Sequence, residues 1–407
     1  MAVATFPRQT WNPRSATSAL EGFMLGLRFV ATPLGRDPRL DLLRGFCVFA
    51  MIVDHIGGAS WLYWLTGGNT GPVTAAEGFV FLSGLVLGIV SRRRIAKNGL
   101  WAAVRASLAR AWTLYKLTFA LTLVFVMLTV GTTLSLWVDR DLLGEPDSWL
   151  TLVTAVATVR FTWHGTDILA LYALLLAAAP LALMLLASGR PFALLAASWA
   201  LWLAVQVFPT LTALPWQIEH ASTFPFAAWQ ALFFSALVLG YHRQELGAWF
   251  TRESQRPHGA GLVYRFGLGT AACGLLLLGV ALTTDHAHAM TVNGVTLTSL
   301  DLFDKSTLGI GRLAAFASVS TLIYVGVTLF WRPIERATGW LLIPLGQASL
   351  YAYAMHLFLI LVAYNVPPYV GSPEPGWELH NTLGQLTLVL VLWAMVKRKV
   401  LFSLIPR

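Results

Sequence analysis

The segment that decides the fold reads Asp41-Leu42-Leu43-Arg44-Gly45-Phe46-Cys47-Val48-Phe49-Ala50-Met51-Ile52-Val53-Asp54-His55. It places four ionisable residues in a run otherwise apolar enough to cross a bilayer. Arg44 and His55 are eleven residues apart, so a helix projects both from one face, about 16 Å apart along its axis. Asp41 lies one turn before Arg44. Because charged groups at membrane depth usually face a bundle interior, the segment predicts a functional site. The alternative is a buried polar pair that only ties helices together.

Composition is typical of a polytopic membrane protein. Hydrophobic residues make up 57% of the sequence and charged residues 12%, whereas soluble domains carry about a quarter charged residues. The net charge of +9 does not indicate nucleic-acid binding, because most Lys and Arg gather in short segments between apolar runs. We therefore expect a lipid bilayer, and no nucleic acid, as a partner. Cys47 and Cys273 lie in predicted spans, so no disulfide is expected.

Apolar runs long enough to cross a bilayer predict an all-α fold of about ten transmembrane helices in one bundle. The predicted spans are 40–62, 74–91, 111–137, 167–187, 191–208, 225–241, 266–284, 308–330, 339–362 and 381–396. Residues 1–35 form a predicted cytoplasmic segment with an amphipathic patch on the membrane surface. Residues 36–400 form the predicted membrane domain, and residues 401–407 form a predicted cytoplasmic tail.

The distribution of basic residues sets the predicted orientation. With the N-terminus in the cytoplasm, most of the 28 Lys and Arg residues fall in cytoplasmic segments, among them Arg92, Arg93, Arg94 and Lys97. This positive-inside bias predicts that both termini face the cytoplasm. The outer loops are acidic and aromatic, which suits either a sugar ligand or the aromatic belt of a membrane interface.

Six predicted helices carry hydrogen-bonding side chains at one level in the outer half of the membrane. These residues are His55, Glu77, Asp167, Trp229, Gln230, Arg312 and His356. Some also have a purely structural interpretation: Glu77 can pair with Arg312, and His356 can be a satisfied core histidine. Their shared depth favours a common functional site.

A general base is the chemistry that this level suggests. A histidine beside a carboxylate can take a proton from a hydroxyl, because its ordinary pKa of about 6.5 lets it accept one at neutral pH. The ring of His55 is the predicted base. Asp54, Glu77 and Asp167 are the carboxylates that could orient it, and the sequence leaves that choice open.

The cytoplasmic end of the segment suggests the donor. Arg44 and Asp41 lie at this mouth, and an arginine about 16 Å below the histidine suits a ligand with phosphates and a long arm that reaches outward. Coenzyme A has that shape, so acyl-CoA is the predicted donor substrate. The sequence lacks a Gly-rich phosphate loop, HExxH and CxxC, and we expect no metal and no permanently bound cofactor.

Several stretches resemble a known family. They are Arg36-Asp37-Pro38-Arg39-Leu40-Asp41-Leu42-Leu43-Arg44-Gly45, Asp54-His55, Ala76-Glu77-Gly78-Phe79-Val80-Phe81-Leu82-Ser83-Gly84, Asp167-Ile168-Leu169-Ala170-Leu171-Tyr172, Ala228-Trp229-Gln230, Lys305-Ser306-Thr307-Leu308-Gly309 and Leu345-Gly346-Gln347-Ala348-Ser349-Leu350. The chain is similar here to the osmoregulated periplasmic glucan succinyltransferases (OpgC), within the transmembrane acyltransferases. The resemblance implies that Arg44 and His55 form the acyl-CoA and catalytic signature. It also implies functional roles for Asp54, Glu77, Asp167 and Gln230.

The resemblance also implies a reaction and a location. A member of that family moves succinyl from cytoplasmic succinyl-CoA to hydroxyls of a periplasmic glucan, in the bacterial inner membrane. Expected partners are acyl-CoA, the glucan, the bilayer, and membrane proteins of glucan synthesis or a second copy of the chain. Two departures concern the acceptor side: Ala170 stands where Pro is common, and Thr223-Phe224-Pro225-Phe226 replaces an Asn-Pro-like element.

The acyl group and the acceptor remain open at this point. Succinyl carries a free carboxylate, so we expect a cation at the outer site, either Arg312 or Lys305. Trp229, Gln230 and His356 complete the residues expected to bind acceptor or acyl group. Another acyl group or glycan on the same scaffold is one alternative. A proton-coupled transporter with an intramembrane Asp, Glu and His relay is the other, although the paired halves of many transporters are absent from the sequence.

Overall fold

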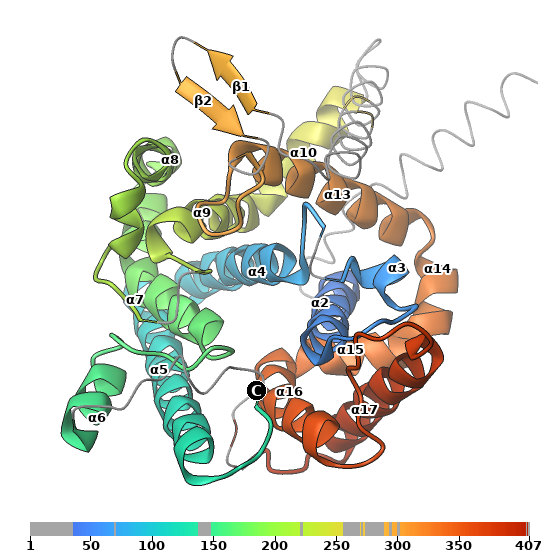
Figure 1. Cartoon of the computed structure of the whole chain (residues 1–407). Helices are drawn as coiled ribbons and strands as arrows, with labels where there is room; N and C mark the ends of the chain where they lie inside the picture. The colour runs from blue at the N-terminus through green and yellow to red at the C-terminus, as the bar shows by residue number, and fades with distance from the viewer. Residues whose placement is uncertain are drawn as a thin grey trace, which may run out of the picture.

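The fold is known from a computed structural model of the chain, and it is a bundle of helices (Figure 1). The structure describes residues 36–68, 71–136, 148–219, 223–254, 289–292, 295–298 and 302–403, with Gly269, Ala272 and Ile405. The predicted N-terminal segment 1–35 and, apart from two residues, the predicted span 266–284 lie outside this part of the chain.

Helices occupy most of the predicted spans. They are α2 (Pro38–Ile56), α4 (Ala75–Asn98), α5 (Leu100–Gly131), α7 (Asp167–Ala187), α8 (Pro191–Val207), α9 (Phe226–Tyr241), α13 (Ile310–Leu329), α15 (Trp340–Gln347), α16 (Ser349–Asn365) and α17 (Glu378–Arg398). The other helical elements are α3 (Tyr63–Thr66), α6 (Trp149–Ala157), η2 (Pro209–Ala213), α10 (Arg243–Ser254), α14 (Trp331–Ile334) and η3 (Glu335–Gly339). An antiparallel hairpin of β1 (Ala289–Val292) and β2 (Val295–Thr298) adds strands that the all-α prediction lacked.

The prediction of ten spans is not confirmed. Within the described residues, five helices are long and apolar enough to cross a membrane. A sixth span results if the bent pair Trp331–Gln347 and Ser349–Asn365, which contains α15 and α16, counts as one. The two parts of that pair meet at an angle of 94°, whereas the sequence predicted a single span at 339–362. Helix α2 is not among these five helices, because it carries the charged residues Arg39, Asp41, Arg44 and Asp54.

Local signals set the limits of α2. Asp37 accepts a hydrogen bond from the backbone N–H of Arg39 at 3.1 Å, and Pro38 occupies the first turn, where its missing N–H costs nothing. The helix ends at Ile56 because Gly57 adopts a φ of 72°, a left-handed value that glycine tolerates. It is therefore shorter than the predicted span 40–62, but it carries both Arg44 and His55 on one continuous helix, as the sequence predicted.

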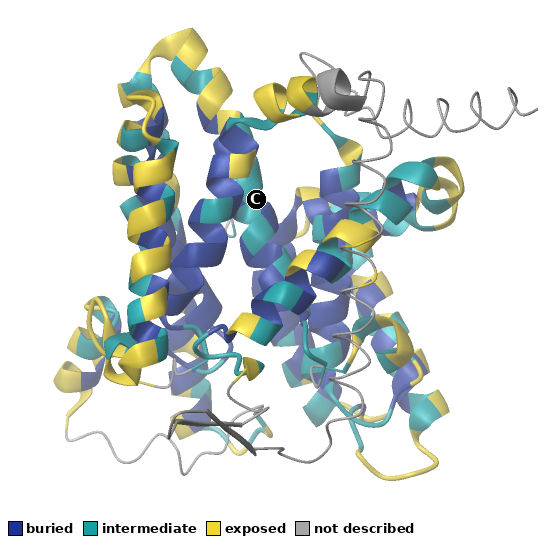
Figure 2. Cartoon of the chain, turned by 90° about the horizontal axis from the view of Figure 1, so that it is seen from above, coloured by how far each residue is buried: buried dark blue, intermediate teal, exposed yellow. Residues whose placement is uncertain are grey.

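Helices α2 and α4 lie in the middle of the bundle, with α5, α7, α8 and α9 on one side and α13 to α17 on the other (Figure 1). Buried residues line the interior and exposed residues face outward (Figure 2). Backbones touch where α2 meets α15: a Cβ on Gly346 would lie 1.8 Å from the carbonyl oxygen of Asp41. Small residues are typical of helix contacts in membranes because they permit this approach.

The chain direction separates two ends of the bundle. Helices α2 and α16 run toward one end, where Tyr364 of α16 donates to the Ile56 carbonyl at 2.7 Å. Helices α4 and α7 begin at that end, which we call the pocket end, and α5 reaches it where Thr122 meets Thr166 at 2.8 Å. Basic segments such as Arg92 to Lys97 follow at the opposite, basic end.

This arrangement leads to a topology prediction: the basic end faces the cytoplasm. In a background without Cys47 and Cys273, Ser254→Cys should resist an impermeant thiol reagent in intact cells and react after the membrane is opened. Glu374→Cys, in the exposed loop between α16 and α17, is the matched control and should react in intact cells. If the cysteine at position 254 is modified in intact cells, the predicted orientation is wrong and the basic end faces outward.

Candidate active site

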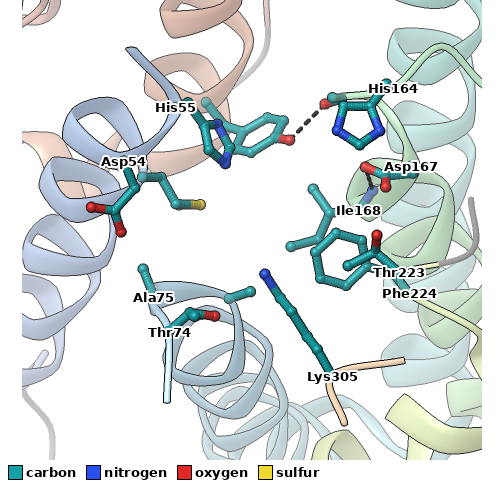
Figure 3. A pocket seen from close by; sticks show the side chains of 14 residues that line it. Asp54, His55, Thr74, Ala75, His164, Asp167, Ile168, Thr223, Phe224 and Lys305 are labelled. Atoms are coloured by element: carbon teal, nitrogen blue, oxygen red, sulfur yellow. Dashed lines mark hydrogen bonds between the residues drawn. The ribbon is translucent and has the colours of Figure 1, made fainter. Parts of the chain in front are cut away.

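A pocket of about 140 Å³ lies at the pocket end of the bundle (Figure 3). It is bounded by the end of α2, the starts of α4 and α7, the segments before α9 and α13, and α16. The polar residues that line it are Asp54, His55, Thr74, His164, Asp167, Thr223, Lys305 and Tyr353. Three of the predicted catalytic residues, His55, Asp54 and Asp167, therefore share one cavity.

His55 is paired with a second histidine. Its Nδ1 lies 2.9 Å from Nε2 of His356, which comes from α16 and is 1% exposed. The other nitrogen of His356, Nδ1, donates to the backbone carbonyl of Tyr353. The sequence suggested a carboxylate as the group that orients His55, and the structure places a histidine at Nδ1 instead.

The three candidate carboxylates have other hydrogen bonds. Asp54 accepts from the hydroxyl of Thr66 at 2.6 Å. Asp167 accepts from the backbone N–H of Ile168 at 2.8 Å, which satisfies a donor in the first turn of α7. Both carboxyl groups remain in the pocket wall, where they can accept hydrogen bonds from hydroxyl groups of a ligand.

Glu77 is a structural residue of the pocket rather than part of its wall. It is fully buried, and its Oε2 accepts from the backbone N–H of Thr74 at 2.9 Å and from the Thr74 hydroxyl at 2.6 Å. Its Oε1 accepts from Nε of Arg312. The ion pair between Glu77 and Arg312, the structural interpretation of the sequence, is confirmed, and it joins α13 to α4.

In this ion pair, Arg312 is already bound to Glu77, although it was one of the two cations expected at the outer site. Arg312 is 5% exposed, and besides Glu77 it donates to the carbonyl of Phe303 at 3.2 Å. It does not line the pocket, whereas Lys305 does. Of the two candidates, Lys305 is therefore the one that the fold brings to the cavity of His55.

The segment that carries Lys305 is held at many points. Asp304 Oδ2 accepts from the backbone N–H of Thr307 at 2.7 Å and from two hydroxyls of the same turn. Trp202 and Gln206 of α8 donate to the carbonyls of Leu308 and Thr307 at 3.1 and 2.8 Å. Such a fixed loop presents Lys305 at a defined place in the pocket.

The pKa values of two ionisable groups in this loop, Asp304 and Lys305, depart from their ordinary values. Burial raises the pKa of Asp304, but hydrogen bonds from Ser306 and Thr307 outweigh it, so the pKa is lower than the ordinary value. Burial lowers the pKa of Lys305, and the negative charge of Glu77 opposes that effect. The ammonium of Lys305 also lies 5.5 Å from the ring centroid of Phe224 in the pocket wall.

The predicted acceptor residues Trp229 and Gln230 do not reach the pocket. Gln230 is buried against Ser198 of α8, whose hydroxyl donates to Oε1 at 2.6 Å, while its Nε2 donates to the Ser198 carbonyl at 2.8 Å. Trp229 is fully buried, and its ring centroid lies 4.9 Å from that of Phe224, which does line the pocket. Trp229 therefore supports the wall from behind, whereas Gln230 joins α9 to α8.

In the first half of α2, the guanidinium carbon of Arg44 lies 6.0 Å from the ring centroid of Phe79. Its Nε has no hydrogen-bond partner among the described residues. Asp41 is buried and pairs with Arg36 through two hydrogen bonds of 2.6 and 2.8 Å. The carboxylate of Asp41 is thus already bound, whereas Arg44 has a buried donor to offer.

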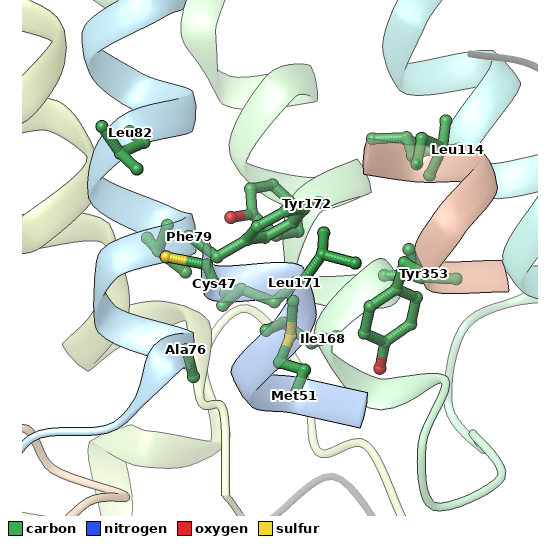
Figure 4. Close-up of a cluster of buried hydrophobic side chains, with 14 of the residues drawn as sticks. Cys47, Met51, Ala76, Phe79, Leu82, Leu114, Ile168, Leu171, Tyr172 and Tyr353 are labelled. Carbon is green, nitrogen blue, oxygen red and sulfur yellow. The ribbon is translucent and has the colours of Figure 1, made fainter. Parts of the chain in front are cut away.

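Buried apolar side chains of α2, α4 and α7 form a cluster beside α2 (Figure 4). Cys47 and Met51 of α2 face Phe79 of α4 and Tyr172 of α7 in this cluster, and Phe79 meets the Tyr172 ring edge to face at 5.4 Å. Met51 also lines the pocket. The cluster therefore lies along the same face of α2 that joins Arg44 to His55.

Sequence reasoning missed His164 and Tyr353. His164 precedes Asp167 by three residues, just before the first turn of α7, and a helix start after a polar cluster is a signal that could have identified it. Tyr353 precedes His356 by three residues, so in a helix the two share a face. Its hydroxyl donates to the carbonyl of Gly165 at 2.6 Å, which joins α16 to the segment that carries His164 (Figure 3).

Comparisons with known proteins show the family of the chain. No curated protein matches the chain. A protein-family model described as "OpgC protein" matches residues 36–403, which include every element of the pocket. Because the match covers nearly the whole chain, the protein belongs to the OpgC family.

Proposed function

We propose that the protein is an integral-membrane O-acyltransferase that moves succinyl from cytoplasmic succinyl-CoA to hydroxyls of a periplasmic glucan. Family membership supports a glucan-modifying transferase in a membrane, and the apolar helices support the same location. The finer statements, namely the succinyl donor, the transfer across the bilayer and the bacterial inner membrane, are part of the proposal.

One observation carries the proposal: a single continuous helix, α2, joins Arg44 near the basic end to His55 in the pocket wall. Eleven residues of helix separate them by about 16 Å along the axis. Arg44 is the contact for the donor at the cytoplasmic side, and His55 is the base at the acceptor side. The arm of acyl-CoA would pass along the apolar cluster between them and carry the thioester to the pocket.

The chemical step is ordinary acyl transfer. His55 takes the proton of a glucan hydroxyl, and the hydroxyl oxygen attacks the thioester carbonyl carbon. A C–O bond forms, the C–S bond breaks, and the departing thiolate takes the proton back from His55 to give free coenzyme A. Asp54, His164, Asp167 and Thr223 surround this place in the pocket and offer hydrogen bonds to the sugar.

Mass spectrometry of periplasmic glucans tests the function directly. Cells that produce the protein should add the mass of one or more succinyl groups to the glucan, and cells in which the protein is deleted should not. Reintroducing the wild-type chain should restore the increment, whereas the His55→Ala variant should not. Glucans that are identical in all four strains would favour a transporter over a transferase.

A prediction separates the role of Arg44 from that of His55. If Arg44 binds the phosphates of coenzyme A, Arg44→Ala should raise the KM for succinyl-CoA about ten-fold or more. With succinyl-pantetheine, which has the arm but no phosphates, wild type and variant should react alike. Arg44→Lys should restore only part of the affinity, because Lys lacks the bidentate fork. A defect of equal size with both donors would refute the phosphate contact.

A further prediction concerns the choice of acyl group. Lys305 is the pocket cation that can bind the free carboxylate of succinyl, so Lys305→Met should lower the preference for succinyl-CoA over acetyl-CoA about ten-fold or more. Activity toward acetyl-CoA should stay near the wild-type value. Lys97→Met, at an exposed lysine near the end of α4, is the matched control and should leave the ratio unchanged. An unchanged ratio in Lys305→Met would remove this assignment.

A further inference from the structure

His55 and His356 meet across two helices although they are 301 residues apart in the sequence. Their ring centroids lie 5.1 Å apart, and Nδ1 of His55 faces Nε2 of His356 at 2.9 Å. His356 is buried on all sides, and the ring of Tyr353 packs against it edge to face at 4.6 Å. The pair is therefore fixed in one arrangement by α2 and α16.

The backbone carbonyl of Tyr353 sets the direction of the hydrogen bond between the rings. A carbonyl oxygen can only accept, so Nδ1 of His356 carries a proton and donates it to Tyr353. Burial favours the neutral imidazole, and in that form the second nitrogen has a lone pair. Nε2 of His356 is therefore an acceptor, and Nδ1 of His55 carries the proton between them.

The same rule applied to His55 determines its reactive nitrogen. With a proton on Nδ1, the neutral ring has its lone pair on Nε2. Nδ1 is directed toward α16, and the side chain of His55 forms part of the pocket wall. The Tyr353 carbonyl thus specifies, through two rings, which nitrogen of His55 is basic.

We propose that His356 is a positioning residue that holds His55 in the tautomer whose Nε2 is the base. The inference rests on the proposed function and deepens it, because it names the residue that orients the base. His356 would do here what a carboxylate does for the histidine of a Ser-His-Asp triad. A neutral partner suits the site, because it avoids an additional negative charge at membrane depth.

The matched variants are His356→Gln, His356→Leu and Gln385→Leu. Glutamine keeps an oxygen that can accept a hydrogen bond from the N–H of His55 Nδ1. Leucine has a similar volume and no acceptor. Gln385 is the structural control: it is buried on α17 and donates to the carbonyl of Gly57 at 2.9 Å, next to the end of α2, with no hydrogen bond to either histidine.

Kinetics on folded, size-exclusion-purified protein give the first test. His356→Leu should lower kcat for succinyl transfer about 10²-fold, with the KM for succinyl-CoA within about two-fold of wild type. His356→Gln should recover at least about a tenth of the wild-type kcat. Gln385→Leu should reduce the yield of folded protein but not kcat. If His356→Leu behaves like Gln385→Leu, the positioning role is refuted while the proposed function stands.

The tautomer itself gives the second test. ¹⁵N spectra of histidine-labelled protein, with the His55 signals identified by their loss in His55→Gln, should show the proton on Nδ1. In His356→Leu the proton should move to Nε2 or exchange between both nitrogens, while His356→Gln should keep it on Nδ1. A proton on Nε2 of His55 in the wild-type protein would overturn the inference, whatever the kinetics show.

Discussion

Replacing His55 by alanine should abolish acyl transfer, a loss of at least about 10²-fold, in a protein that still folds and still binds acyl-CoA. His55 is the base in the proposed step, and its ring lies in the wall of the pocket with Nδ1 bound to His356. Alanine removes the group that accepts the hydroxyl proton and leaves Arg44 in place for the donor. Turnover, acyl-CoA binding and size-exclusion yield should be measured on one preparation.

The control for this experiment is another histidine at the same end of the bundle. His380 on α17 binds the carbonyl of Tyr369 at 2.7 Å and does not line the pocket. His380→Ala should keep nearly the full activity per folded molecule. If His55→Ala also retains most of its specific activity and only the folded yield falls, the pair merely ties helices together and the mechanism is wrong.

The second large effect should come from breaking the buried pair of Glu77 and Arg312. Arg312→Met leaves the carboxylate of Glu77 fully buried without its cation, and losses of about 3–5 kcal/mol are usual for such changes. We expect little folded Arg312→Met protein in detergent. The double variant Glu77→Gln, Arg312→Met removes both charges and should recover much of the yield, because an uncharged pair of similar volume is often tolerated.

An exposed ion pair provides the comparison. Arg92 and Glu245 lie 2.9 Å apart at the basic end, with side chains that are 46% and 49% exposed. Glu245→Gln should change the thermal midpoint very little, since surface pairs contribute about 0–1 kcal/mol. Equal losses for Arg312→Met and Glu245→Gln would contradict the argument that burial makes the Glu77 pair costly to break.

The folded part of the Arg312→Met protein should also lose acyl selectivity. Arg312 donates to the carbonyl of Phe303, two residues before Lys305, so its removal releases the start of the loop that presents the lysine. The preference for succinyl-CoA over acetyl-CoA should therefore fall toward that of Lys305→Met. If the surviving folded fraction keeps wild-type selectivity, the bonds of Asp304 and those from α8 position Lys305 without Arg312.

The sequence alone determined the helical class, the approximate positions of the long helices and the shared helix of Arg44 and His55. Apolar length and periodicity carry that information, because they depend on residues close together in the chain. The start and end of α7 at Asp167 and Ala187 coincide with the predicted span. The resemblance of short motifs also identified the family, which the match over residues 36–403 confirms.

Only the tertiary structure decided which polar groups meet. Several side chains at one depth satisfy the same hydrophobic pattern, and periodicity does not say which helices are neighbours. Packing brings His356 to His55 and leaves Lys305 in the pocket. It also selects the pair of Glu77 and Arg312, which the sequence suggested as one of two interpretations. The bend of 94° between α15 and α16 was likewise invisible, because both halves of that apolar run read as one span. Which helices become neighbours depends on where two backbones can approach closely, as at Gly346 and Asp41. This is a property of the folded bundle.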